Sequence, residues 1–514
     1  MQIQMKTMIL TKYCFAARRE KIVSQEKETE VHVNKVQILK CWDDRVPIYF
    51  KVTNEEENTN GEKFESCGDS SWIKEGEKFG EEKLRERIVP WLSNLFKAEH
   101  LSLLIGSGLT NAVCSIANCE IPSWQDIKFE NISKELEDKI EKEAKESADR
   151  LARGGANLED RIRVVNELIR GLEIYYGSDN KELKNLKNAV DEVLQKFAEL
   201  ILNTEMKFRK SDKNLQKNAL NYLVNFLMSF ASRPGTKERL HIFTTNYDRF
   251  IELGADIAGL RLIDRFIGTL SPIFRSSRLE IDMHYNPPGI RGEPRYLEGV
   301  AYFTKLHGSL DWFNINRTIH RIPIPFGAKS IQPYLDAIGV DDNQSDTIKQ
   351  LMIYPNAAKD RETAEYPYVE LFRDFAASVC RPNTTLVTYG YSFGDEHINR
   401  IIEDMLTIPS THLIIIAYDD NAGRIMSLYD RLGRKEQITI LIGDQLADLK
   451  LLVDNYLPKS AIDFTTFKLD ELIKKILITN SNNIEDNVNG ENGIKIKQDE
   501  NKNEGEERNE LHTI

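Results

Sequence analysis

Two short segments place polar side chains directly after apolar runs. In HIFTTNYDRFIEL (241–253), Asn246 and Asp248 follow a stretch that is typical of a buried strand. Asn246 offers both a donor and an acceptor, whereas an ionised Asp248 can only accept. Asp248 has two open interpretations, a helix N-cap or a ligand-binding group. Asn246 is harder to explain as a cap, because Asp248 already supplies one.

The segment KLHGSLDW places His307 at the end of a second apolar run, followed at once by Gly308. A histidine at the mouth of a cleft can gain or lose a proton near neutral pH, which suits a general base. A single histidine at a strand end is structural more often than not. The presence of TTNYD and GSGLT in the same expected sheet favours a functional role.

A glycine turn between a strand and a helix occurs in LLIGSGLTNAV. Gly106 and Gly108 would let the backbone approach a phosphate, and the amides of Leu109, Thr110 and Asn111 could point at it, helped by the helix dipole. The third glycine of GxGxxG is missing, and no acidic residue ends a second strand about 20 residues on, as the dehydrogenase fingerprint requires. A glycine turn that only allows tight strand–helix packing therefore remains an alternative.

A second strand–loop–helix segment is LVTYGYSFGDEHIN, in which Gly390 and Ser392 follow an apolar strand. The residues after this loop, DEHINRIIEDML, have the pattern of a helix. His397 lies within that helix, and we interpret it as structural rather than catalytic.

The elements that must position these residues alternate between strands and helices. An amphipathic helix is expected at 84–100, and helical segments lie between several of the later strands. The expected strands are LSLLI of 101–110, LHIFTTNYD (240–248), AYFTKLHGS (301–309), TTLVTYGYSFGD (384–395), THLIIIAYDD (411–420) and QITILIGD (437–444). This alternation predicts an α/β fold with a Rossmann-like parallel sheet and helices on both faces. Ligands of such sheets bind beyond the carboxyl ends of the strands, where all these polar groups fall.

Three further segments flank or interrupt this fold. Residues 1–80 are interpreted as an N-terminal appendage with two strands, VHVNKVQILKCW and VPIYFKV, and a polar linker. The fold itself is expected at 84–465, with a charged helical insertion at about 127–235 between its first two strands. Residues 480–514 are rich in Asn, Glu and Lys and poor in aliphatic residues, which predicts a disordered tail.

Composition excludes several classes of protein. The 514 residues carry a formal net charge of -12, which argues against a broadly basic, DNA-coating protein. Six cysteines contain no CxxC pair, so a four-cysteine zinc site has no support. Cys114 and Cys119 are the only close pair, and this spacing is more typical of two separate buried thiols. Without a signal-peptide core or an apolar run of about 20 residues, we expect a soluble, cytoplasmic protein in a reducing compartment.

Taken together, the four motifs resemble the sirtuin-like NAD-binding fold. The glycine loop followed by IPSW (121–124) is similar to the sirtuin glycine loop and its following GIP segment. TTNYD resembles the sirtuin TQNID signature, LHG the catalytic His-Gly, and GYSFGD the later glycine-serine loop. Order and rough spacing match from about residue 84 to 460.

The sequence departs from zinc-binding sirtuins in one respect. Those enzymes carry two CxxC pairs between the histidine strand and the next loop, whereas residues 308–384 contain only Cys380. No zinc module is therefore expected, and with it much of the peptide-docking architecture of protein deacetylases is missing. The residues of the motifs resemble more closely those of the sirtuin-like proteins of bacterial antiphage defence. Members of that branch hydrolyse NAD during phage infection.

This resemblance implies an NAD glycohydrolase that releases nicotinamide and ADP-ribose. His307 would be the general base, and Asn246 would position the attacking water or the hydroxyls of the nicotinamide ribose. Asp248 would bind the nicotinamide carboxamide or orient its neighbours, and Trp124 would close over the nicotinamide. The remaining contacts to NAD would come from Gly106, Ser107, Gly108, Thr110 and Asn111 for the diphosphate, from Gly390 and Ser392 for the adenosine side, and from Asp419 for the adenine ribose.

The resemblance also implies partners. Some proteins of this branch act with a HerA-type hexameric ATPase, and the sequence has no GxxxxGK[ST] P-loop of its own, so any ATPase would be a separate chain. A constitutive NADase would kill its host, so we expect gating by homo-oligomerisation or by a partner; direct binding to nucleic acid stays open. Two alternatives also remain: a subunit that binds NAD or ADP-ribose without turnover, and a sirtuin-type protein deacylase.

Overall fold

The computed structural model describes residues 36–53, 61–122, 127–130, 132–150, 156, 158–177, 180–234, 236–277, 281–286, 295–315, 318–337, 351–353, 366–420 and 422–459. The predicted disordered tail at 480–514 and the first part of the predicted appendage lie outside these residues.

The central sheet contains eleven strands in the order β4-β3-β2-β1-β18-β17-β16-β5-β6-β12-β7. From β18 to β7 all neighbouring strands pair in parallel. The parallel strands are β5 (His100–Ile105), β6 (His241–Thr244), β7 (Arg261–Ile263), β12 (Val300–Lys305), β16 (Thr384–Tyr389), β17 (His412–Ala417) and β18 (Ile438–Ile442). The predicted parallel α/β sheet is therefore confirmed, and its continuous apolar runs are those of strands buried on both faces.

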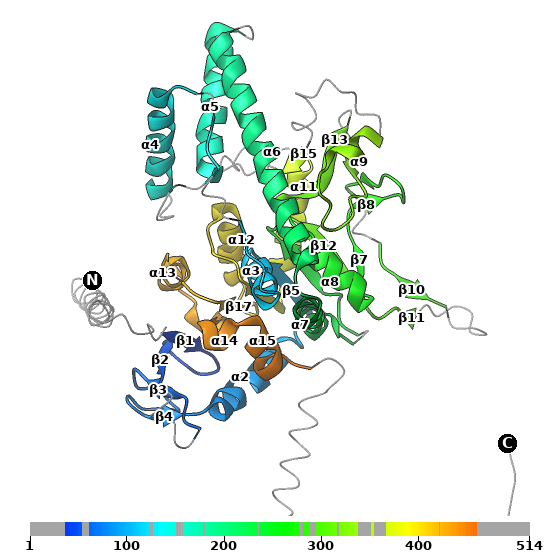
Figure 1. The fold of residues 1–514 in the computed structure, drawn as a ribbon. Coiled ribbons are helices and arrows are strands. Elements are labelled where there is room, and N and C mark those ends of the chain that lie inside the picture. The colour runs from blue at the N-terminus through cyan, green and yellow to red at the C-terminus, as the bar shows by residue number, and fades with distance from the viewer. Residues whose placement is uncertain are drawn as a thin grey trace, which may run out of the picture. The chain divides into compact units, whose positions relative to one another are not determined.

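Helices cover both faces of this sheet, as predicted (Figure 1). Side chains alternate between the faces along each strand. On β5, Leu101, Leu103 and Ile105 belong to one core cluster, whereas Leu104 belongs to the other. The first cluster is completed by α2 (Glu81–Leu95), α3 (Gly108–Ile116), α7 (Lys213–Ala231), α8 (Phe250–Ala258), α14 (Asp444–Ala447), α15 (Leu449–Leu451) and η7 (Leu452–Tyr456), and the second by α11 (Tyr368–Val379), α12 (Glu396–Leu406) and α13 (Arg424–Arg431).

The helical insertion lies between β5 and β6, where the sequence predicted it. It consists of α4 (Lys134–Arg150), α5 (Leu158–Tyr176) and α6 (Lys181–Lys210), which run beside one another in Figure 1. These helices share a third apolar cluster with Leu310 and Phe313. The last helix of the segment, α7, instead packs on the main sheet. No helix among the described residues is long and apolar enough to cross a membrane.

Residues 37–79 extend the same sheet. The strands β1 (Gln37–Lys40), β2 (Ile48–Val52), β3 (Phe64–Ser66) and β4 (Lys78–Phe79) join it through antiparallel pairing of β1 with β18. Both strands expected in this part of the chain are present as β1 and β2. The sequence did not indicate that they pair with a strand some 400 residues later, because such pairing leaves no local pattern.

A smaller antiparallel sheet combines two strands that precede β12 with three that follow it, in the order β15-β13-β14-β9-β8. Its strands are β8 (Phe266–Ile267), β9 (Ile273–Phe274), β13 (Gly308–Ile315), β14 (Thr318–Arg321) and β15 (Leu351–Ile353). The remaining elements are the hairpin of β10 (His284–Tyr285) and β11 (Arg295–Tyr296), α9 (Gln332–Ala337) and η6 (Lys435–Gln437).

The strand order reverses between β5 and β16. From β5 the chain builds β6, β7 and β12 on one side, then returns to place β16, β17 and β18 on the other. In open α/β sheets the crevice at the carboxyl ends of the two strands at such a switch point is the usual ligand site. The loops that begin at Gly106 and Gly390 lie at this point.

Candidate functional site

The two glycine loops are packed directly against each other. The amide of Gly106 donates to the carbonyl of Tyr389 at 3.0 Å, and the amide of Gly108 donates to that of Gly390 at 3.0 Å. A Cβ on Gly106 would lie 2.5 Å from the Gly390 oxygen, and one on Gly108 would lie 2.5 Å from the Gly390 Cα. Gly390 also has a φ of +59°, in the left-handed region. All three positions therefore require glycine for backbone packing.

This packing uses amides that the sequence assigned to a phosphate. The Leu109 amide donates to the Gly106 carbonyl at 3.2 Å, and the Asn111 amide donates to Ser107 at 3.1 Å within the first turn of α3. Ser107 is exposed at the N-cap of α3, and its side chain makes no capping hydrogen bond. In the loop after β5 the groups suited to an anion thus include the α3 dipole and the Ser107 hydroxyl.

Asn246, Thr110 and Asp248 form one hydrogen-bonded group that joins the loops after β5 and β6. The Asn246 Nδ2 donates to the Gly106 carbonyl at 3.1 Å and to the Thr110 Oγ1 at 3.2 Å. The Thr110 hydroxyl donates to the Asp248 Oδ2 at 2.7 Å. Both N–H groups of the Asn246 side chain are therefore used, which leaves Oδ1 as the atom through which this buried residue could act on a ligand.

Asp248 is held on three sides. Its Oδ2 accepts from Thr110, and its Oδ1 accepts from the Phe250 amide at 3.3 Å, at the start of α8. Its backbone carbonyl accepts from the Lys305 Nζ. This arrangement fits a residue that caps α8 and orients its neighbours, two of the roles considered from the sequence.

Arg249, the residue after Asp248, anchors the loop between β6 and α8, here called the site loop, to the helical insertion. Arg249 donates through Nε and Nη2 to the two carboxylate oxygens of Glu205 on α6, at 3.1 and 2.6 Å. Glu205 is fully buried, and burial raises its pKa in spite of the opposing guanidinium. The same carboxylate accepts from the amides of Arg249 and Gly327 at 3.1 and 3.2 Å. The pair is therefore well satisfied, as a buried ion pair must be.

His307 lies at the carboxyl end of β12 and faces the second glycine loop. It is buried, with 6% of its surface exposed, and its Nε2 lies 3.8 Å from the Oδ2 of Asp395. This separation is too long for a direct hydrogen bond, but a hydroxyl oxygen placed between the two atoms could contact both. Gly308 follows with a φ of +85°, so the turn into β13 requires glycine.

Backbone hydrogen bonds join the loop after β12 to the loop after β6. The Leu306 amide donates to the Thr244 carbonyl at 2.8 Å, and the Leu310 amide donates to the Tyr247 carbonyl at 3.2 Å. The Tyr247 and His307 rings lie 6.1 Å apart between centroids. The structure thus brings His307 and the NYD segment to neighbouring positions on one edge of the sheet.

Side-chain hydrogen bonds stabilise the loop that carries Ser392 and Asp395. The Asn399 Nδ2 donates to the Phe393 carbonyl at 3.0 Å, and the Tyr391 hydroxyl lies 3.4 Å from the Asp395 carbonyl. Phe393 is buried with a φ of +53°, a conformation that is costly for a bulky side chain and recurs at functional sites. Ser392 is exposed beside it.

The remaining sequence-predicted residues are less well placed. Asp419 is exposed after β17. Trp124 lies outside the described residues.

Two residues that the sequence did not single out lie at this edge. Asp395 was within the quoted GYSFGDEHIN motif, and an acidic residue after a glycine-serine loop was the available signal. Arg424 on α13 lies against the loop, since a Cβ on Gly394 would be 2.7 Å from its Nη1. No sequence pattern placed α13 beside this loop. Arg424 offers a positive charge that could neutralise a phosphate.

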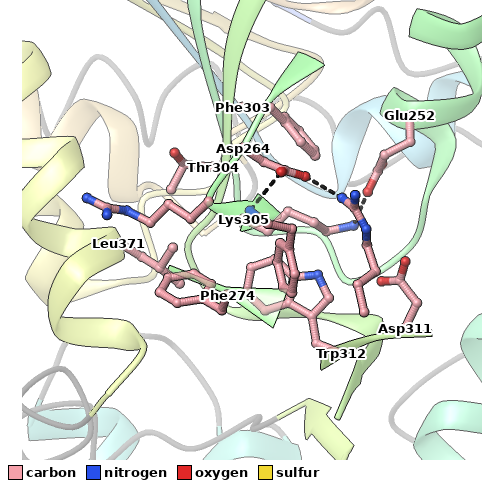
Figure 2. A pocket seen from close by; sticks show the side chains of 12 residues that line it. Glu252, Asp264, Phe274, Phe303, Thr304, Lys305, Asp311, Trp312 and Leu371 are labelled. Atoms are coloured by element: carbon pink, nitrogen blue, oxygen red, sulfur yellow. Dashed lines mark hydrogen bonds and ion pairs between the residues drawn. The ribbon is translucent and has the colours of Figure 1, made fainter. Parts of the chain in front are cut away.

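A small cavity of about 40 Å³ surrounds the side chain of Lys305 (Figure 2). Lys305, which is 2% exposed, extends into it, and its Nζ donates to the Glu252 Oε1 at 2.9 Å. Burial raises the pKa of Glu252, and the Lys305 charge opposes that shift. The cavity is lined by Glu252, Asp264, Arg265, Phe266, Phe274, Phe303, Thr304, Lys305, Asp311, Trp312, Arg321 and Leu371. None of these is a sequence-predicted site residue, and Lys305 supports the site loop from this side.

Metal ligands do not gather in the described part of the chain. No group of three or more His, Cys, Asp or Glu side chains there is arranged to hold a metal ion. The side chains at the switch point that could take part in chemistry include His307 and Asp395, which face each other, and the Asn246 oxygen.

Comparison with known proteins gave a match to a family model but no match to a curated protein. Residues 240–440 match the family model described as a SIR2-like domain. The match spans β6, β12, β16 and β17 and contains TTNYD, KLHGS and GYSFGD, whereas the loop at Gly106 precedes it. Fold, site and match together support a sirtuin-like domain in this chain.

Proposed function

We propose that this chain is an NAD glycohydrolase that cleaves NAD to nicotinamide and ADP-ribose. The observation that carries the proposal is the pairing of buried His307 with partly buried Asp395, with 3.8 Å between Nε2 and Oδ2, beside the Asn246 loop at the switch point. An NAD-related activity is what a SIR2-like domain suggests. The choice of hydrolysis over deacylation rests on the sequence, which lacks the paired cysteines of the deacetylase zinc module.

The reaction requires a ribose with oxocarbenium character and an activated water. The bond from ribose C1′ to the nicotinamide nitrogen breaks, and its electron pair leaves with nicotinamide. The Asn246 Oδ1 accepts a hydrogen bond from a ribose hydroxyl or from the water. As the water oxygen bonds to C1′, His307 takes its proton, and the Asp395 carboxylate stabilises the resulting imidazolium.

Binding of the dinucleotide uses the other groups at this edge. The N-terminus of α3 and Ser107 face the diphosphate on one side, and the Arg424 guanidinium neutralises it on the other. Gly390 and Ser392 line the adenosine side. Because the glycine loops interlock, their contribution is a fixed backbone surface rather than a set of free amides.

The biological role in this proposal is depletion of NAD during phage infection, as in the bacterial defence proteins that the motifs resemble. Activity would then be gated by assembly of several chains or by a separate HerA-type ATPase. The only support for a role in phage infection is the sequence similarity of the motifs.

The proposal is tested by measuring both the cleavage of NAD and the binding of NAD by the same chain. The full chain is incubated with NAD, and nicotinamide and ADP-ribose are quantified by chromatography while NAD binding is followed by calorimetry. Equal amounts of the two products support hydrolysis. Binding without products would instead indicate a sensing subunit. Products formed only when an acetylated peptide is added, with acetyl-ADP-ribose among them, would indicate a deacylase.

A further inference from the structure

The end of α3 brings two cysteines together. The Cys119 amide donates to the Cys114 carbonyl at 2.9 Å, and the Asn118 amide donates to the Ser115 carbonyl at 3.0 Å. Asn118 has a φ of +51°. These two bonds and one left-handed residue define a Schellman motif, in which the side chains at the positions of Cys114 and Cys119 meet. The sequence spacing had suggested two separate buried thiols, and the turn geometry gives the opposite arrangement.

The two thiols have different surroundings. Cys114 is fully buried in the core beneath α3, whereas Cys119 is partly exposed. The interaction between the two neighbouring thiols lowers the pKa of Cys119 and raises the pKa of Cys114. The Lys207 ammonium also lowers the pKa of Cys119. Cys119 is therefore the more accessible and the more acidic of the two thiols, and Cys114 lies buried behind it.

We propose that Cys119 and Cys114 are a redox-active dithiol that reacts with a hydroperoxide and closes to an intramolecular disulfide. An accessible thiolate next to a second thiol is the arrangement that such a reaction needs. The 6→1 hydrogen bond of the turn keeps the two residues next to each other at the end of α3. The proposal concerns these thiols alone and does not depend on NAD cleavage.

The chemistry balances in two steps when the oxidant is hydrogen peroxide. The Cys119 thiolate attacks one peroxide oxygen, the O–O bond breaks, and the departing hydroxide takes up a proton to become water. Cys119 is then a sulfenic acid. The Cys114 sulfur attacks the Cys119 sulfur, the S–O bond breaks, and hydroxide leaves with the Cys114 proton as a second water. Two thiols have lost two electrons, and the peroxide has gained them.

The test uses the reduced full chain, freed of reductant, treated with hydrogen peroxide, alkylated and digested with trypsin. No Lys or Arg occurs between Lys97 and Lys128, so Cys114 and Cys119 fall in one peptide, 98–128, which contains no other cysteine. We expect this peptide to lose two hydrogens and to resist alkylation, while Cys380 is still alkylated. Full alkylation of both thiols in 98–128, at a dose that leaves Cys380 unchanged, would overturn the proposal.

Two variants test the assignment of roles. In Cys114→Ser, Cys119 should stop at the sulfenic acid and be trapped by a dimedone probe; in Cys119→Ser, Cys114 should remain a thiol. The matched control is Cys380→Ser, which removes another partly exposed cysteine whose pKa burial raises and should leave the 98–128 disulfide intact. In the untreated chain, iodoacetamide should modify Cys119 about tenfold faster than Cys380. Equal alkylation rates, or oxidation of Cys114 that persists in Cys119→Ser, would contradict the proposal.

Discussion

The side-chain amide of Asn246 donates a hydrogen bond to the backbone carbonyl of Gly106 across 3.1 Å. This bond ties the loop after β6 to the loop after β5, and the Thr110 hydroxyl adds a second link through Asp248. The candidate site is therefore one connected unit, and a change in either loop should be felt in the other.

Thr110→Val tests this connection. The change keeps the shape of the side chain but removes the buried hydroxyl that donates to Asp248 and accepts from Asn246. We expect a loss of about 1–3 kcal/mol in the free energy of unfolding, together with slower nicotinamide release. Urea denaturation and product chromatography measure the two effects. The control is Thr388→Val, where the lost bond to Ile414 is weaker, at 3.4 Å. Equal effects in both variants would contradict the special role of Thr110.

Gly390→Ala tests the interlocked loops. The new methyl group would meet the Gly108 Cα at 2.5 Å, in a backbone with a φ of +59°. We expect strong destabilisation and loss of NAD binding, because neither backbone can move without separating β5 from β16. The matched control is Gly171→Ala within α5, where a Cβ meets nothing within 4 Å. There alanine should stabilise the chain by about 0.5–1 kcal/mol. Calorimetric binding of NAD to Gly390→Ala with wild-type affinity would disprove this packing.

Glu205→Ala tests the anchor between α6 and the site loop. Removal of the carboxylate leaves the Arg249 guanidinium buried without its counter-charge, so we expect a loss of about 3–5 kcal/mol in the free energy of unfolding. The control is Glu135→Ala, which breaks an exposed pair with Lys139 on α4 and should leave stability unchanged. If the two variants unfold at the same denaturant concentration, the anchor has no energetic role.

Acid should weaken the fold through His241. This histidine is 8% exposed, its Nε2 lies 2.9 Å from the Thr304 hydroxyl, and burial lowers its pKa to about 3. The unfolded chain takes up the proton near pH 6.5 and the folded chain does not, so stability falls as the pH drops below about 6.5. The slope for this one group is about 1.4 kcal/mol per pH unit down to its folded pKa.

Urea denaturation of wild type and His241→Gln between pH 7.5 and 4.5 measures that slope. The variant should lose less stability on acidification than the wild type. His412, whose pKa burial lowers to about 4, contributes in the same direction and remains in both proteins. Parallel curves for the two proteins would show that His241 is not the titrating group.

The sequence predicted the parallel core because each strand is a continuous apolar run that ends in polar residues. It predicted the helical insertion because long charged segments with apolar stripes separate β5 from β6. It could not predict that β1 joins β18, or that β8, β9 and β15 complete a second sheet around β13 and β14, since both depend on pairing between distant segments. The short edge strand β7 was missed because Arg261–Ile263 is too brief to show alternation.

The sequence predicted which loops form the candidate site, but it did not predict the contacts between them. The motifs indicated which strand ends carry chemistry, and parallel topology placed them at one edge. The sequence could not tell that the glycine amides donate to backbone carbonyls, because that depends on how closely two loops approach. It also missed the Asp395–His307 pair, since a carboxylate near a helix start is usually a cap.

The pair can be tested by its effect on the pH profile. Asp395→Asn keeps the shape but removes the charge that stabilises a protonated His307. We expect a fall of about tenfold or more in kcat for NAD cleavage with little change in KM. The pH at which the rate falls on the acid side should move down, because the imidazole is less easily protonated. Asp395→Glu should recover part of the rate, whereas an unchanged profile in Asp395→Asn would show that the Asp395 charge does not act on His307.

The most direct measurement is nicotinamide release from NAD by the full chain and by His307→Ala, over a range of protein concentrations that allows assembly. We expect the wild-type chain to release nicotinamide and ADP-ribose in equal amounts and the His307→Ala chain to lose this activity, with NAD binding retained by calorimetry. NAD that binds the wild-type chain and stays intact at every concentration, or equal rates in the two proteins, would contradict catalysis by His307.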